Sequence, residues 1–232
     1  MVTGSLVRDL AGGGLKNGLL QRAASALEEI RRRFFGFTWN EVYDFVEFTA
    51  DNAPTEMRRT LIQTCNTVLE RENSGFRFVG DQIVDITSPS EIASIEEAIK
   101  CTSPLSGIQA HIETALRFLA DRKTPDFRNS IKESISAVEG ICVAVTGDLS
   151  ATLGKALTVL EKRHNLHSAL KRSFEALYGY TSDQEGIRHA MLEETDLSYT
   201  DAKYMLIACS AFVNYIVGKS ADWGLSLKSV RK

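Results

Sequence analysis

The sequence predicts an all-α protein with one short β-hairpin. Apolar residues recur at spacings of three and four over most of the chain, which is the pattern of amphipathic helices. Only residues 76–86 show a strand pattern, with short apolar runs on both sides of Gly80-Asp-Gln. The 232 residues are 44% hydrophobic and 25% charged, a composition typical of an ordinary globular protein.

Four segments are expected along the chain. They are a flexible, glycine-rich start (1–18), a helical extension with the hairpin (19–87), a main helical bundle (88–218) and a loose basic tail (219–232). No strand precedes Gly12 to Gly14 and no Gly-Lys-Ser/Thr follows, so a phosphate-binding loop is not expected there.

The extension contains three predicted helices, at 19–35, 38–48 and 54–72. Thr38 and Glu41 have the spacing of a capping box at the second helix, and Pro54 suits the first turn of the third. An isolated hairpin is only marginally stable, so the hairpin should pack on helices or pair with another chain.

The bundle begins with a helix capped by Ser88 or Ser90. Long helices follow at 105–119 and 124–145, and the short connection between them predicts antiparallel neighbours. Shorter helices are expected at 150–160 and 165–177, the latter capped by Asn165, before a turn at 178–183. The closing helix at 200–217 has few charges after its first turn, so it should be buried on several sides.

Charge and cysteine usage limit the functional classes. The net charge of -3 and the isoelectric point near 5.9 do not indicate a general nucleic-acid binder, although a local basic patch is compatible with them. The four cysteines are scattered and form no CxxC pair, which favours a reducing cytoplasm over a disulfide-bonded or zinc-bound protein. No run of about 18 consecutive apolar residues is present, so neither a membrane-spanning protein nor a membrane partner is expected.

Charged residues gather on one side of the helix predicted at 124–145. At about 100° per residue, Arg128, Lys132 and Glu139 share one narrow stripe, and Asn129 and Glu133 lie beside it. Grouped charges of both signs at the edge of an apolar arc make this helix the first candidate for a functional site.

Three stretches of the chain resemble a known family. The runs FRNSIKESISAVE (127–139), GIRHAM (186–191) and DAKYMLIACSAFVNYI (201–216) are similar to the fourth class of AbiJ amino-terminal domains, a prokaryotic abortive-infection branch of the HEPN superfamily. The resemblance covers residues 88–218 and, more loosely, residues 30–87. It implies a HEPN-like helical bundle that pairs as a homodimer. It also implies a metal-independent endoribonuclease, without a cofactor, in an anti-phage or toxin-type setting.

The sequence departs from the motif of active HEPN members. Those members carry an arginine, a polar residue, and a histidine after four to six intervening residues, but no histidine stands in that window after Arg128-Asn129. We therefore expect a rearranged site that uses Arg128 and His189 first, then Arg188, with Asn129, Glu133 and Glu139 as orienting groups. Alternatively, Arg128 pairs with a carboxylate of its own chain, and His189 only caps a helix or borders the core.

A second candidate is a basic patch for RNA. It comprises Lys162, Arg163, His164, His167 and Lys171, and it would follow an RNA backbone if one helix ran through it. A solvated corner between two helices explains the same charges equally well. His164 and His167 lack a nearby carboxylate or cysteine in the spacing of known metal sites, so no metal site is expected.

Three functions remain open at this stage. The first is RNA cleavage by attack of the 2′-hydroxyl, which leaves a cyclic phosphate. The second is a non-catalytic dimerisation module that binds RNA, a nucleotide or a partner protein, and the missing histidine favours it. The third is a protein that neutralises a separate effector of a defence system.

Overall fold

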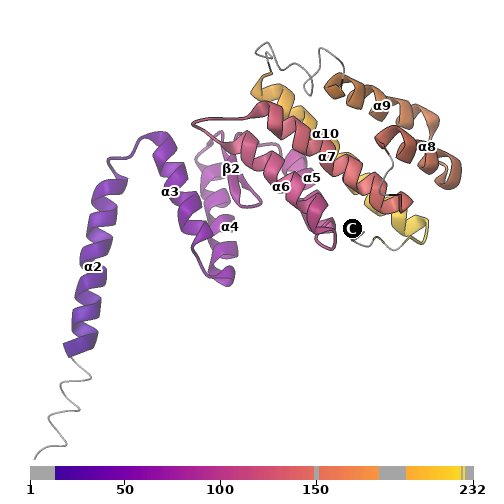
Figure 1. Cartoon of the computed structure of the whole chain (residues 1–232). Helices are drawn as coiled ribbons and strands as arrows, with labels where there is room; N and C mark the ends of the chain where they lie inside the picture. Colours follow the sequence, from indigo (N-terminus) through magenta and orange to yellow (C-terminus); the bar gives the residue numbers. More distant parts are fainter. Residues whose placement is uncertain (1–13, 149–151, 183–196, 226, 228–232) are drawn as a thin grey trace, which may run out of the picture. The chain divides into compact units, whose positions relative to one another are not determined.

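The computed structural model confirms a predominantly helical fold with one two-stranded hairpin (Figure 1). It describes residues 14–148, 152–182, 197–225 and 227. The contacts divide the chain into two units, residues 1–52 and residues 53–232. Each unit is described separately below, and the segment boundary near residue 87 stays a prediction.

The first unit contains α2 (Gly14–Phe34) and α3 (Trp39–Asp51). The predicted capping box at the start of α3 is confirmed, because the Glu41 carboxylate accepts the Thr38 backbone N–H at 2.8 Å. Aromatic rings join the two helices at the end of α2, where the Phe34 ring lies 5.6 Å from that of Phe45 and 5.9 Å from that of Phe37.

The second unit begins with α4 (Thr55–Arg71), followed by β1 (Arg77–Val79) and β2 (Gln82–Val84), which pair antiparallel. The hairpin packs on α4, α5 (Pro89–Cys101) and α6 (Ser106–Ala120), which confirms one of the two environments predicted for it. The Asn66 side chain on α4 donates to the Phe78 carbonyl at 3.0 Å and accepts the Phe78 N–H at 2.7 Å. Asn66 therefore occupies the edge of β1 that another strand could have used.

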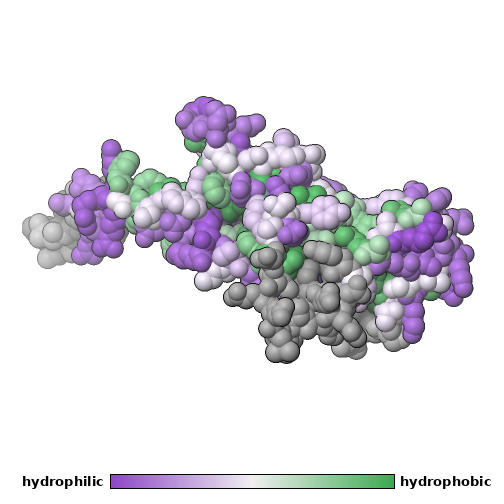
Figure 2. All heavy atoms as spheres, turned by 90° about the horizontal axis from the view of Figure 1, so that it is seen from above, coloured by the Kyte–Doolittle hydropathy of each residue, from purple (hydrophilic) through white to green (hydrophobic). Residues whose placement is uncertain are grey.

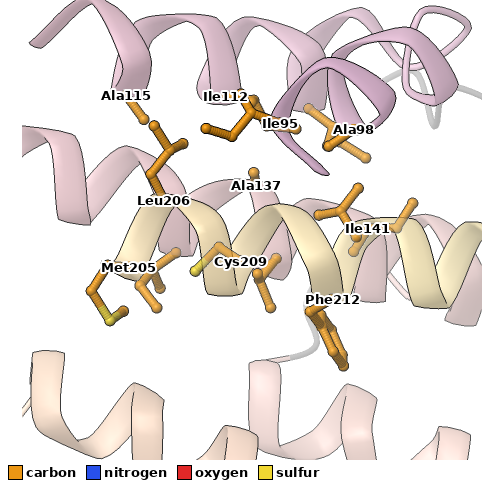
Figure 3. Packing of buried hydrophobic residues seen from close by; sticks show 14 of the residues in the cluster. Ile95, Ala98, Ile112, Ala115, Ala137, Ile141, Met205, Leu206, Cys209 and Phe212 are labelled. Atoms are coloured by element: carbon orange, nitrogen blue, oxygen red, sulfur yellow. The ribbon is translucent and has the colours of Figure 1, made fainter. Parts of the chain in front are cut away.

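The core of this unit is formed by α5, α6, α7 (Phe127–Thr146) and α10 (Tyr199–Asp222). Figure 3 shows Leu206, Cys209 and Phe212 of α10 among the side chains of the neighbouring helices. α7 packs most extensively on α6 and α10, and α10 also packs on α5 and α6, so the closing helix is buried on several sides as predicted. By length and composition α10 could cross a membrane, but its place in this core accounts for its apolar sequence.

α8 (Leu153–His164) and α9 (Ser168–Ser182) complete the described part of the unit. α9 contacts α10 where the Phe174 and Phe212 rings lie 3.6 Å apart. Two local predictions were wrong here. Asn165 does not begin the second helix but ends the first in a left-handed conformation (φ 54°), and α9 continues to Ser182 where a turn was expected.

Candidate functional site

α7 carries four of the predicted catalytic residues: Arg128, Asn129, Glu133 and Glu139. All four are half-buried at the edge of the core-facing arc. The Asp126 side chain caps the helix by accepting the backbone N–H of Asn129 at 2.9 Å, and it also accepts the Asn129 side-chain amide at 2.6 Å. Asn129 therefore contributes to the start of the helix, and its amide is engaged locally.

Glu133 contacts a histidine that is not among the predicted site residues. Its Oε2 atom lies 2.6 Å from Nδ1 of His111, which belongs to α6. The His111 side chain is 42% exposed and the Glu133 side chain 22%, so the pair lies at the protein surface but is partly shielded from solvent. The structure therefore forms a histidine–carboxylate pair between two neighbouring helices.

The packing of α6 against α7 fixes this pair. About one turn along the interface, the buried Ser130 hydroxyl donates to the Ala115 carbonyl at 2.8 Å. In the other direction the backbone of Gly140 approaches Ile108 so closely that an added Cβ would lie 3.0 Å from its Cγ1 atom. Contacts on both sides of the pair set the antiparallel register that places His111 beside Glu133.

The pair has the chemistry of a general base. An ionised carboxylate only accepts hydrogen bonds, so the Glu133 side chain selects the tautomer in which Nδ1 of His111 carries the proton. The other ring nitrogen, Nε2, then keeps its lone pair and can take a proton from a substrate hydroxyl. Lys132, one residue before Glu133, is exposed and adds a cation on the same turn of α7.

The other predicted catalytic residues, Arg188 and His189, lie outside the described residues. The proposed meeting of Arg128 with His189 therefore stays a prediction. His111 was missed because the HEPN motif requires an arginine a few residues upstream of the histidine in the same segment, and His111 has none at that distance. The signal that could have found it was the predicted antiparallel pairing of residues 105–119 with 124–145, which brings positions 22 apart in sequence side by side.

The predicted basic patch is divided by the end of α8. The continuous helix on which it depended is absent, because the left-handed Asn165 separates α8 from α9. Lys171 forms an ion pair with Glu161, with Nζ and Oε2 2.8 Å apart, and this carboxylate raises the pKa of the Lys171 ammonium group. Its charge is thus largely compensated within the protein, whereas Lys162 and Arg163 remain exposed at the end of α8.

The two histidines of the patch have separate structural environments. The His164 ring stacks on that of Trp223 with centroids 4.6 Å apart. Nδ1 of His167 accepts the backbone N–H of Ala169 at 3.1 Å, so this side chain caps the start of α9. Both contacts favour the corner between two helices that was the alternative to an RNA-binding face.

A groove of about 620 Å³ lies between α4, the hairpin turn and α5. Its charged lining residues are Arg58, Arg59 and Glu96. Arg58 is paired with Asp81 of the turn at 3.3 Å, and Glu96 accepts the Gly80 N–H at 3.4 Å. The charges on its walls thus mainly hold the hairpin in place. Among the described residues, no three histidine, cysteine, aspartate or glutamate side chains gather as metal ligands would.

Comparison with known protein families finds a match over the first part of the chain. Residues 14–100 match the family described as AbiJ N-terminal domain 4. This range runs from α2 to α5, so it includes the groove but ends before the helices that carry His111 and Glu133. The expected resemblance was placed mainly on residues 88–218, and the match lies mostly on the extension instead. No curated protein and no solved structure shows significant similarity to this chain.

Proposed function

We propose that the chain is a ribonuclease of the abortive-infection type that cleaves RNA through the His111–Glu133 pair. The observation that carries the proposal is the 2.6 Å contact between His111 Nδ1 and Glu133 Oε2 at a partly exposed site. The similarity of residues 14–100 to AbiJ N-terminal domain 4 supports the abortive-infection setting.

In the proposed reaction, Nε2 of His111 takes the proton of a ribose 2′-hydroxyl. The 2′-oxygen attacks the adjacent phosphorus, and the bond from phosphorus to the 5′-oxygen of the next nucleotide breaks. The 5′-oxygen leaves with a proton supplied by solvent, and a 2′,3′-cyclic phosphate remains on the other product. Glu133 holds the ring and stabilises the imidazolium, and Lys132 offsets the charge that builds on the phosphate.

The HEPN-type homodimer belongs to the same proposal. Each α6–α7 pair provides a single histidine–carboxylate site, and two copies facing one another would place two such sites along one RNA strand. Light scattering of the purified chain at several concentrations tests this part independently of activity.

A test of the nuclease compares three histidine variants of the full chain on a mixed pool of tRNA and mRNA in excess EDTA. His111→Asn should lower the cleavage rate by about 10²–10⁴-fold, the range for loss of a general base. His167→Asn is the matched control, because asparagine also caps helices and should leave the rate unchanged. His189→Asn tests the histidine that lies outside the described residues.

The position of the loss decides between the two sites. Cleavage that disappears in His111→Asn and persists in His189→Asn, with cyclic-phosphate ends, supports the pair. The reverse result would refute it in favour of the rearranged site. Glu133→Gln should reduce the rate and also change the ¹⁵N shifts of the His111 ring, which report the protonated nitrogen, whereas a purely structural role would change only the stability.

The second candidate is a non-catalytic binding module. The local use of Asn129 favours it, because the Asp126 carboxylate accepts the Asn129 side-chain amide at 2.6 Å and so engages the polar residue that follows Arg128. The hydrogen bond between His111 and Glu133 would then only stabilise the packing of α6 on α7. Wild-type protein that retains RNA without cutting it, with equal retention by His111→Asn, supports this candidate.

A further inference from the structure

α2 has a wide apolar face that its own unit does not cover. At about 100° per residue, Ala23, Leu27, Ile30 and Phe34 lie within roughly 60°, and Ala24 and Ala26 widen the apolar arc to about 160°. The Leu27 side chain is 66% exposed and Phe35 76%. In the described part of this unit the rings join α2 to α3 at Phe34, so the preceding turns have no neighbour there.

The charge of α2 is positive and concentrated at one end. The helix carries five cations, namely Lys16, Arg22, Arg31, Arg32 and Arg33, against the carboxylates Glu28 and Glu29. Glu29 is already paired with Arg32 and Arg33, each at 2.7 Å. The basic cluster lies beside the aromatic residues that end the helix, and hydrophilic and hydrophobic residues adjoin at the left of Figure 2, where α2 and α3 are drawn.

Arg31 distinguishes between the surfaces that could cover this face. It lies about 40° from Leu27, inside the apolar arc, and its guanidinium lies 5.7 Å from the Phe35 ring centroid. If another helix packed on this face, the Arg31 guanidinium would be buried between the two helices, which is unfavourable for a charge. On a lipid surface the long arginine side chain can extend to the headgroups while its methylenes stay among apolar neighbours.

We propose that α2 binds an anionic lipid surface, with Leu27 and Ile30 inserted and Arg31–Arg33 at the headgroups. The combination of a wide apolar face, a basic cluster and interfacial aromatic residues is that of a helix lying in the membrane interface. This differs from a membrane-spanning segment, and it revises the expectation that no membrane is a partner. It is independent of the proposed nuclease.

The test uses the full chain and flotation with two kinds of vesicle, phosphatidylcholine alone and equal parts of phosphatidylcholine and phosphatidylglycerol. Wild type should float with the anionic vesicles and much less with the neutral ones, and added salt should weaken binding. Leu27→Glu should weaken binding by about tenfold or more. Met57→Glu, on α4, is the matched control, since Met57 is 65% exposed and should not contribute.

The basic cluster has its own control. Replacement of Arg31, Arg32 and Arg33 by glutamine should weaken binding by about a hundredfold, from the contribution of each cation near an anionic surface. The same change at Lys162 and Arg163, which are exposed at the end of α8, should have little effect. Trp39, 61% exposed after the aromatic cluster, should show a blue-shifted emission on binding in a Trp223→Phe background.

Two results would overturn the proposal. One is the absence of wild-type flotation with the anionic vesicles. The other is a mass that doubles with concentration in light scattering without lipid, returns to that of one chain in Leu27→Glu, and is accompanied by no vesicle binding. The second result would assign the face to another copy of the chain.

Discussion

Asn66→Ala should destabilise the second unit by about 2 kcal/mol. The Asn66 side chain makes two hydrogen bonds to the backbone of Phe78, a fully buried residue. Truncation leaves one N–H and one C=O without these partners, and each lost partner costs about 1–3 kcal/mol when water cannot replace it. Asn66 also lines the open groove, so water can partly replace the lost hydrogen bonds. We therefore expect about 1 kcal/mol for each of the two backbone groups, which gives about 2 kcal/mol in total.

Urea unfolding followed by far-UV circular dichroism measures this effect. The midpoint should fall while the dependence of the free energy of unfolding on urea stays constant, because the buried area changes little. Thr67→Ala is the control on the same helix, since its hydroxyl donates to the Gln63 carbonyl at an exposed position. A loss below about 0.5 kcal/mol for Asn66→Ala, equal to that of the control, would refute the role assigned to Asn66.

Two further predictions concern the interior and the helix ends. Burial raises the pKa of the Cys142 and Cys209 thiols to about 12. Both should therefore resist iodoacetamide at about pH 8 until the protein is unfolded, while Cys65 reacts first. Fast alkylation of Cys142 in the folded state, detected by mass spectrometry, would contradict this. Gly147 ends α7 with φ 72°, and an added Cβ there would meet no atom within 4 Å. Gly147→Ala should therefore lower the free energy of unfolding by about 1–2 kcal/mol through backbone strain alone, whereas Gly179→Ala inside α9 should raise it by about 0.5–1 kcal/mol. Equal effects of the two variants in urea unfolding would disprove this reasoning.

The helices were predictable from the sequence because their signals are local and repeated. Apolar residues at spacings of three and four recur over many turns in α6, α7 and α10, so the period identifies each of them without tertiary information. The capping box of α3 is likewise contained in four consecutive residues. The end of α8 was harder, because an asparagine is compatible with both a helix start and a left-handed helix end, and only the packed backbone selects between them.

Only the part of the candidate site that depends on local pattern could be predicted from the sequence. The sequence placed Glu133 on a charged stripe of α7, which needs only the helical period. It did not pair Glu133 with His111, because the partner stands on another helix and the contact depends on the register set by Ser130, Ala115, Gly140 and Ile108. The same holds for the hairpin. Its strands are predicted by local pattern, but the hydrogen bonds of Asn66 to Phe78, 12 residues later, occupy the edge of β1 and could not be predicted from it. A helical period repeats in every turn, so the helices can be identified from local pattern alone. A side-chain hydrogen bond needs one specific partner at short range, and only the packing of the helices brings that partner into place.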